Sequence, residues 1–175
     1  GLLALEKVGL AEEIKKISIP MHGRSIHNPD GSIAFQPYGK EGQYINSVSR
    51  GTLNMKLMDL AEQHGVQIFF HEKCTTLDWE KDVLEFENTS GVSIPSSKAD
   101  LVFAADGAFS AARLQHQLRH DKFNYQQSYI DCGYTELTIP ATADGHFAID
   151  VTAPHIWPRK DYMLLAFPNL DNTFL

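Results

Sequence analysis

The residues best suited to ligand chemistry follow an apolar run in the second half of the chain. Residues 99–105 are largely hydrophobic and end at Asp106-Gly107, so we expect a strand that delivers one carboxylate at its C-terminal end. Open α/β sheets bind ligands at that end of their strands. Gly107 would let the backbone approach a ligand closely, and Ser110 can cap a following helix that reaches about Leu118. The simpler alternative is that Asp-Gly is only a turn.

The elements around this motif alternate between helical and extended patterns. We expect a helix over the first sixteen residues, broken near Gly9, and a second helix that begins after Ser49 and ends at Gly65. Between them, the turn signal at residues 28–31 predicts a hairpin over 21–36. Further strands are expected at 66–70, 75–79, 83–86, 128–139, 146–151, 154–158 and 162–167. The fold class is therefore mixed α/β, with a mostly antiparallel sheet beside an α/β layer.

The composition is that of an ordinary globular protein. The 175 residues are 43% apolar and 21% charged, and the formal charge of −7 argues against a nucleic-acid surface. No run approaches the roughly 18 apolar residues of a membrane span. Cys74 and Cys132 form no CxxC pair, which fits a reduced, cytoplasmic compartment, and the histidines show no metal-ligand spacing.

The stretch around Asp106 also has a family resemblance. A small residue followed by Asp106-Gly107-x-x-Ser110-x-x-Arg113 is similar to the Asp-Gly motif of the flavoprotein aromatic hydroxylases. In that family the aspartate hydrogen-bonds the sugar-alcohol chain of the flavin. The resemblance therefore implies that Asp106 and Gly107 bind the cofactor.

Further stretches narrow the resemblance to the kynurenine 3-monooxygenases, in order and in spacing, from Gly1 to Leu175. They are residues 19–27, 37–39, 43–50, 133–140, 155–159 and 166–170. The resemblance implies an internal fragment of an FAD- and NADPH-dependent monooxygenase. Such an enzyme uses O2 to hydroxylate L-kynurenine to 3-hydroxykynurenine, in tryptophan catabolism and pyridine nucleotide biosynthesis.

Three substrate residues follow from the resemblance. Arg24 and Tyr38 match the pair that holds the amino-acid carboxylate of kynurenine, and Ile156 would line the pocket for the aromatic ring. The chemistry agrees, because a guanidinium binds a carboxylate bidentately and a phenol can donate one more hydrogen bond. The alternative from the residues alone is a solvated Arg24 and a Tyr38 ring that packs on a turn.

Two further cofactor residues are implied. Arg50 matches a flavin-contacting arginine, and the helix dipole does not explain a cation at the start of a helix. The alternative is a surface arginine or an ion pair. Cys74 matches a position whose backbone touches the adenine side of FAD. We expect no catalytic side chain and no metal.

The resemblance also implies which segments of the chain bind FAD and which bind the substrate. Residues 1–18 and 45–125 would belong to an FAD-binding domain, and residues 19–44 and 126–175 to a substrate-binding β-sheet region. None of the twelve glycines forms the GxGxxG spacing that binds the pyrophosphate of FAD, so we expect the chain alone to hold FAD weakly and to be inactive. Eukaryotic members of the family carry a C-terminal membrane anchor, which we do not expect in this chain, and a eukaryotic parent would lie at the mitochondrial outer membrane.

Two other functions stay open at this point. The first is a related flavin-dependent hydroxylase for another aromatic acid, which needs Asp106 and Arg50 but not the pair of Arg24 and Tyr38. The second is a non-catalytic, β-rich binding module, which would hold no flavin.

Overall fold

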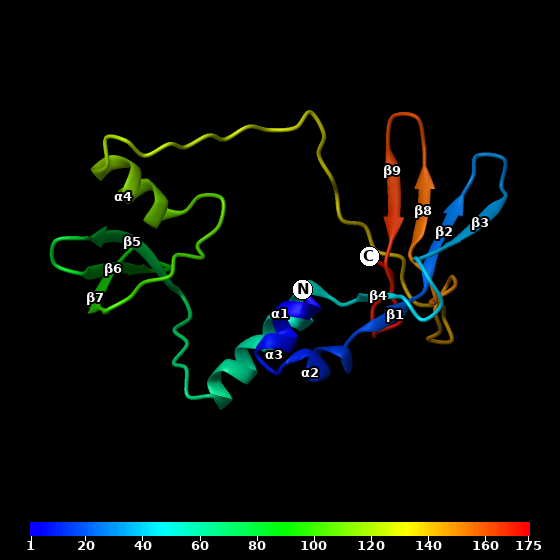
Figure 1. Cartoon of the computed structure of the whole chain (residues 1–175), viewed down its shortest axis with the longest axis horizontal. Coiled ribbons are helices and arrows are strands. Elements are labelled where there is room, and N and C mark those ends of the chain that lie inside the picture. Colours follow the sequence, from blue (N-terminus) through cyan, green and yellow to red (C-terminus); the bar gives the residue numbers. More distant parts are fainter. The chain divides into compact units, whose positions relative to one another are not determined.

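The computed structural model describes residues 1–175, which form two compact units (Figure 1). Unit 1 comprises Gly1–Val66 and Tyr134–Leu175, and unit 2 comprises Gln67–Gly133. These boundaries differ from those predicted for the FAD-binding and substrate-binding segments. Compact units do not show which ligand a segment contacts, so the predicted assignment of segments to ligands stays a prediction.

The helices of unit 1 confirm the local signals for where helices begin and end. The first helical region is α1 (Leu2–Lys7) and α2 (Ala11–Lys15), separated at Gly9, whose φ is +74°. Helix α3 (Arg50–Gln63) begins after Ser49, whose hydroxyl accepts a hydrogen bond from the Thr52 amide at 3.5 Å. It ends before Gly65, where φ is +84°, a value that glycine adopts readily.

Two sheets complete unit 1. Strands β1 (Ile19–Met21) and β4 (Ile45–Ser47) form an antiparallel pair. The larger sheet has the order β3-β2-β8-β9, seen side by side in Figure 1. Its strands are β2 (Gly23–His27), β3 (Ile33–Pro37), β8 (His155–Pro158) and β9 (Met163–Ala166). The predicted hairpin and the last two predicted strands are confirmed, and only β2 and β8 run parallel.

A histidine pair on the buried side of this sheet joins β2 to β8. The ring nitrogens His27 Nε2 and His155 Nδ1 lie 2.8 Å apart, and His155 Nε2 lies 2.7 Å from the carbonyl oxygen of Asp150. Because a carbonyl can only accept, His155 Nε2 donates to it, and His155 Nδ1 then accepts from His27 when both rings are neutral. Trp157 stacks on His27 with ring centroids 4.3 Å apart, and the fully buried Phe174 meets His155 edge-on.

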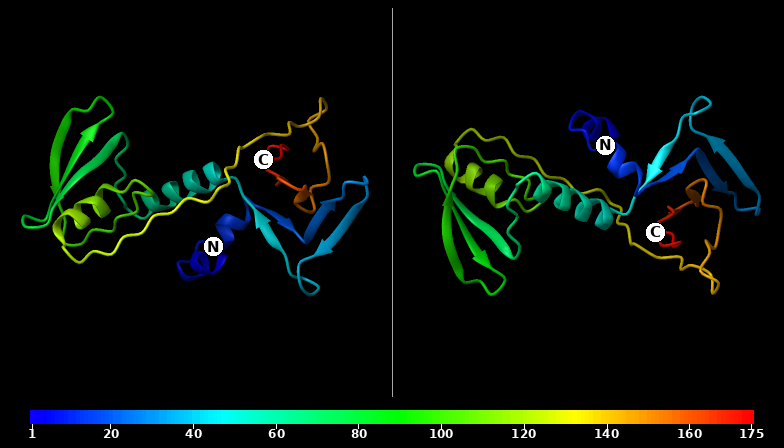
Figure 2. Two further views of the ribbon diagram at one scale, coloured as in Figure 1. Left: turned by 90° about the horizontal axis from the view of Figure 1, so that it is seen from above. Right: turned by 90° about the horizontal axis from the view of Figure 1, so that it is seen from below.

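Unit 2 is one antiparallel sheet with a helix packed against it. Its strands are β5 (Glu72–Asp78), β6 (Val83–Asn88) and β7 (Ser93–Lys98), in that order. Helix α4 (Ala111–Arg119) packs on β5, as the two views of Figure 2 show. The predicted strands at 75–79 and 83–86 and the predicted helix are confirmed. Strand β7 was not predicted, because its sequence is polar and contains a proline.

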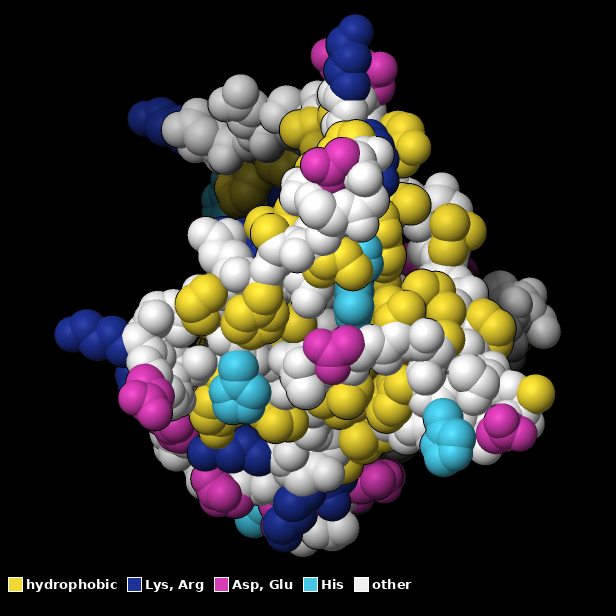
Figure 3. Space-filling model, turned by 90° about the vertical axis from the view of Figure 1, so that its right-hand side faces the viewer, with side chains coloured by type: hydrophobic (Ala, Val, Ile, Leu, Met, Phe, Trp, Pro, Cys, Tyr) yellow, Lys and Arg dark blue, Asp and Glu magenta, His cyan; other side chains and the backbone are white.

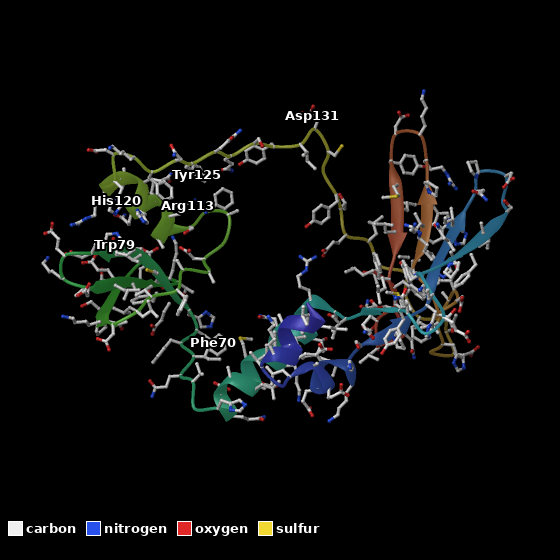
Figure 4. The ribbon with its side chains drawn as sticks, in the orientation of Figure 1. Phe70, Trp79, Arg113, His120, Tyr125 and Asp131 are labelled. Carbon is white, nitrogen blue, oxygen red and sulfur yellow. The ribbon has the colours of Figure 1, made fainter.

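Four predicted strands are wrong. Residues 66–70 and 99–105 pair with no other strand, and their side chains are open to solvent: Phe69 is 67% exposed and Phe103 85%. Phe70 lies on the connection that leads to β5 (Figure 4). A strand needs a neighbour for its backbone hydrogen bonds, and no other segment of the chain supplies one here. Residues 128–139 and 146–151 form no strand either, except that Ile139 makes one bridge to Phe174.

The mixed α/β class with antiparallel sheets is confirmed. None of the helices combines the length and the apolar character required to span a bilayer.

Candidate functional site

The strand register brings two of the predicted substrate residues to one face of the large sheet. Ile26 pairs with Ile156 across β2 and β8, and Ile156 pairs with Leu165 across β8 and β9. Paired residues point to the same side of a sheet, and residues two apart in one strand do so as well. Arg24, two residues before Ile26, therefore shares a face with Ile156. The histidine pair lies on the opposite face.

Tyr38 belongs to the same face. Arg24 pairs with Gln36 in the β2–β3 hairpin, and Tyr38 lies two residues beyond Gln36. The Tyr38 amide donates to the carbonyl oxygen of His22 at 2.9 Å, which continues the ladder by one more pair. Tyr38 lies one residue beyond the end of β3, so the alternation of the extended ladder places its side chain on the same side as that of Arg24, and both residues are half-buried.

An apolar cavity lies along β9 on unit 1. Its volume is about 420 Å³, within the range of small-molecule sites. Leu165, the partner of Ile156, lines it, and the other lining residues are Arg50, 134–137, 163, 164, Phe167 and Leu175. Figure 3 views the structure from the side of Figure 1 on which β2 and β3 lie, and hydrophobic side chains (yellow) are plentiful at that surface.

Arg50, one of the residues that line this cavity, is the first residue of α3. Its Nη2 lies 3.4 Å from Oε1 of Glu136, and its side chain is 83% exposed. An ion pair was one of the alternatives for Arg50, and this one is long and open to solvent. Such pairs contribute about 0 to 1 kcal/mol, so Arg50 stays available to another anion.

The Asp-Gly motif of unit 2 closes on itself through hydrogen bonds. Asp106 accepts from the Ser110 hydroxyl at 2.6 Å and from the Ala112 amide at 3.2 Å. Ser110 also caps α4 by accepting from the Arg113 amide at 2.9 Å. Arg113 donates back to the carbonyl oxygens of Gly107, at 3.3 Å, and of Ala108. The positions of Asp106, Ser110 and Arg113 in the motif are therefore explained by hydrogen bonds at the N-terminus of α4.

Two ionisable groups of unit 2 respond to this arrangement. A hydrogen bond from the Ser110 hydroxyl and a weaker contribution from the Ala112 amide hold the pKa of Asp106 below its ordinary value. This carboxylate is therefore ionised at neutral pH. Burial raises the pKa of the Cys74 thiol, and the negative charge of Asp106 adds to the rise. Cys74 on β5 therefore lies within electrostatic reach of Asp106.

A second cavity, of about 280 Å³, adjoins the motif. Asp106, Gly107 and Arg113 line it together with aromatic rings from Trp79 and Phe123. Gly107 has a φ of +80° and no neighbouring atom within 4 Å of where a side chain would begin. The wall therefore offers one ionised carboxylate beside open backbone, as a hydroxyl-rich ligand chain would require. Figure 4 shows Trp79, Arg113 and Tyr125 at this end of unit 2, where Arg113 lies over the Tyr125 ring.

The predicted residues thus form two groups, one in each unit. Arg24, Tyr38, Ile156 and Arg50 lie in unit 1, and Cys74, Asp106 and Gly107 lie in unit 2. Two partners were missed from the sequence: Gln36, which touches Arg24, and Glu136, which pairs with Arg50. The register of the hairpin could have indicated Gln36, but no local signal connects Glu136 with a residue 86 positions earlier.

Comparison with known proteins gives a consistent result in sequence and in fold. No family model matches the sequence. Kynurenine 3-monooxygenases match it over 99% of its length: that of Flavobacterium johnsoniae is 44% identical, that of Christiangramia forsetii 45%, and that of Dictyostelium discoideum 36%. The chain spans only 37% to 39% of the length of these relatives.

Two solved structures share the fold. Klebsiella pneumoniae HpxO complexed with FAD and uric acid superimposes with a TM-score of 0.63 at 17% identity, over 99% of this chain and 43% of that one. A variant of the same protein complexed with FAD gives 0.65 at 15% identity, over 99% and 44%. The resemblance of this chain to the kynurenine 3-monooxygenases is thereby confirmed along nearly its whole length.

Proposed function

We propose that this chain supplies the substrate-carboxylate site and part of the flavin site of an FAD-dependent monooxygenase. The complete reaction converts L-kynurenine, NADPH, a proton and O2 to 3-hydroxykynurenine, NADP⁺ and water. The observation that carries the proposal is the common face of Arg24, Tyr38 and Ile156. The similarity to kynurenine 3-monooxygenases supports this reaction, and the FAD bound in the two HpxO structures supports the cofactor.

Arg24 and Tyr38 would bind the amino-acid end of the substrate. A guanidinium donates two parallel hydrogen bonds to a carboxylate, and the Tyr38 phenol can donate a third. Ile156 and the apolar wall of the β9 cavity would hold the aromatic ring and exclude water. These residues bind and orient the substrate, and none of them has to accept or donate a proton.

Arg50, Cys74, Asp106 and Gly107 would contact FAD, which supplies the oxidation chemistry when it is bound. Asp106 would accept hydrogen bonds from the sugar-alcohol chain of the flavin, and Gly107 would let that chain lie against the backbone. Arg50 would face an anionic part of the cofactor. The side chain of Cys74 stays out of this contact, because only its backbone would touch the adenine side.

The activity is tested in a complete polypeptide that contains this sequence. NADPH oxidation is measured with and without L-kynurenine, and the product is identified by mass. Stimulation with formation of 3-hydroxykynurenine supports the proposal. A flavin-containing protein that ignores L-kynurenine would indicate a hydroxylase for another aromatic acid, and a colourless, inert protein would indicate a binding module.

For location we propose the cytoplasm, or the mitochondrial outer membrane in a eukaryote, since both cysteines are free thiols.

The substrate site is tested by Arg24→Met in the same polypeptide. We expect FAD content to stay unchanged and L-kynurenine to bind about 10- to 100-fold more weakly, because two charge-assisted hydrogen bonds are lost. Arg119→Met is the control, since Arg119 forms an exposed ion pair with Glu80 at 3.0 Å in unit 2. Unchanged affinity in Arg24→Met would rule out this site.

A further inference from the structure

The side chain of Gln36 holds the guanidinium of Arg24. Arg24 Nε donates to Gln36 Oε1 at 2.8 Å, between residues that face each other across β2 and β3. The two side chains leave the same face of the sheet, so the hydrogen bond crosses directly from strand to strand. This is the only side-chain hydrogen bond that Arg24 makes within the chain.

The contact fixes the direction of the guanidinium. This group is planar and carries its five N–H donors in a rigid fork, so binding Nε sets the orientation of the whole plane. The four remaining N–H donors, on Nη1 and Nη2, then form one free end. A carboxylate that approaches this end can accept two parallel hydrogen bonds, whereas the edge that contains Nε is already occupied.

The contact also leaves the charge of Arg24 uncompensated. Gln36 is neutral, and Arg24 takes part in none of the ion pairs of the chain. A glutamate at position 36 would offer an oxygen in the same place but would add a negative charge. It would form its own ion pair with Arg24 and repel an incoming carboxylate. The amide thus does what a carboxylate there could not: it orients the cation without consuming its charge.

We propose that Gln36 is a positioning residue, which orients Arg24 to bind the substrate carboxylate end-on through Nη1 and Nη2. This inference rests on the proposed function of Arg24 and adds to it a second residue and a binding geometry. Gln36 itself need not touch the substrate, because it acts through Arg24.

The test uses Gln36→Ala and Gln36→Glu in the complete, FAD-containing polypeptide. The dissociation constants are measured for L-kynurenine and for its analogue without the carboxylate. We expect Gln36→Ala to weaken L-kynurenine binding about 3- to 10-fold, and Gln36→Glu to weaken it by about 10-fold or more. The carboxylate-free analogue should bind all variants equally. Gln63→Glu adds the same charge at the exposed end of α3 and should bind as the unmodified protein does.

A double-mutant cycle separates positioning from general packing. In the Arg24→Met background, Gln36→Ala should have no further effect on L-kynurenine binding, because its effect passes through Arg24. If both ligands weaken together, or the two effects add, Gln36 has only a structural role and the inference is wrong. If Arg24→Met leaves the affinity for L-kynurenine unchanged, the proposed function of Arg24 is wrong. If Arg24→Met weakens binding but the Gln36 variants bind L-kynurenine as the unmodified protein does, only the inference about Gln36 is wrong.

Discussion

At the scale of single residues, the three charged side chains assigned to the sites are each held by a partner in the chain. Asp106 is bound by Ser110, Arg24 by Gln36 and Arg50 by Glu136. The partners differ in kind: a hydroxyl and an amide orient without neutralising, whereas Glu136 competes for charge. Orientation before binding lowers the cost of ordering a side chain when a ligand arrives.

The role of Ser110 gives a prediction at this scale. Ser110→Ala removes both the cap of α4 and the main hydrogen bond to Asp106, so we expect unit 2 to lose about 1 kcal/mol of stability. The pKa of Asp106 should rise towards its ordinary value. Urea unfolding followed by Trp79 fluorescence and an NMR titration of the carboxyl carbon measure the two effects. Ser90→Ala is the control, since only its backbone is hydrogen-bonded in the structure.

The sign of the pH effect follows from the lowered pKa of Asp106. The folded state keeps this carboxylate ionised at lower pH than the unfolded chain does. Its contribution is therefore complete above the unfolded pKa of about 3.9 and is lost as the pH falls towards the lowered folded value. The free energy of unfolding of Ser110→Ala should therefore change less over this acidic pH range than that of the unmodified chain. An equal change in the variant and the unmodified chain would contradict the assigned contact.

At the scale of elements, the pairing of β2 with β8 unites segments from the two ends of the chain. The Ser25 amide donates to the Pro154 carbonyl at 2.9 Å, and behind it the rings of His27 and His155 meet. Burial lowers the pKa of His27, and the nearby His155 and Arg159 add to this. Arg159 also donates to the His27 carbonyl oxygen at 3.0 Å, and Asp150 contributes the carbonyl that His155 binds.

This pair predicts acid sensitivity in unit 1. Since the folded pKa of His27 is lowered, its contribution to stability is complete above the unfolded pKa of about 6.5 and declines as the pH falls below it. His27→Gln keeps a donor for His155 but cannot take up a proton, so its urea midpoint should fall less between about pH 7.5 and about pH 5.5. Trp157 fluorescence reports the midpoint, and His64→Gln, an exposed histidine, should behave as the unmodified chain does. Identical slopes in His27→Gln and the unmodified chain would exclude the pair as the cause.

At the scale of the whole molecule, the two units differ in how much core they contain. The fully buried Phe174 and Met21 belong to unit 1, with Ala11, Ile14, Leu60, Ala153 and Ala166, whereas the buried apolar residues of unit 2 are Leu77 and Ala112. Burial of apolar surface is the main favourable term in folding, so unit 2 should be the less stable.

Each unit contains one tryptophan, which makes this difference measurable: Trp79 lies in unit 2 and Trp157 in unit 1. We expect the Trp79 signal to change at lower urea concentration than the Trp157 signal, recorded in Trp157→Phe and Trp79→Phe chains respectively. Far-ultraviolet circular dichroism of the two variants at zero urea checks that each is folded. A single coincident transition would show that the units unfold together.

Local signals determined a large part of this protein from the sequence alone. Ser49 and Ser110 mark where helices begin, Gly65 marks where one ends, and the turn at residues 28–31 specifies the hairpin, because caps and turns depend only on neighbouring residues. The motif that begins at Asp106 is local in the same way. The resemblance to a hydroxylase family, carried by such stretches, could also be recognised without a structure.

Only the tertiary structure decided which segments pair. Residues 66–70 and 99–105 have the composition of strands but lack a neighbour, and a strand is defined by its partner rather than by its own sequence. The common face of Arg24, Tyr38 and Ile156 depends on a parallel register between residues about 130 positions apart, as does the meeting of His27 with His155. Glu136 lies in no strand and meets Arg50 of α3 from 86 positions away, so only the tertiary structure shows that contact, whereas the contact of Gln36 with Arg24 follows from the local hairpin.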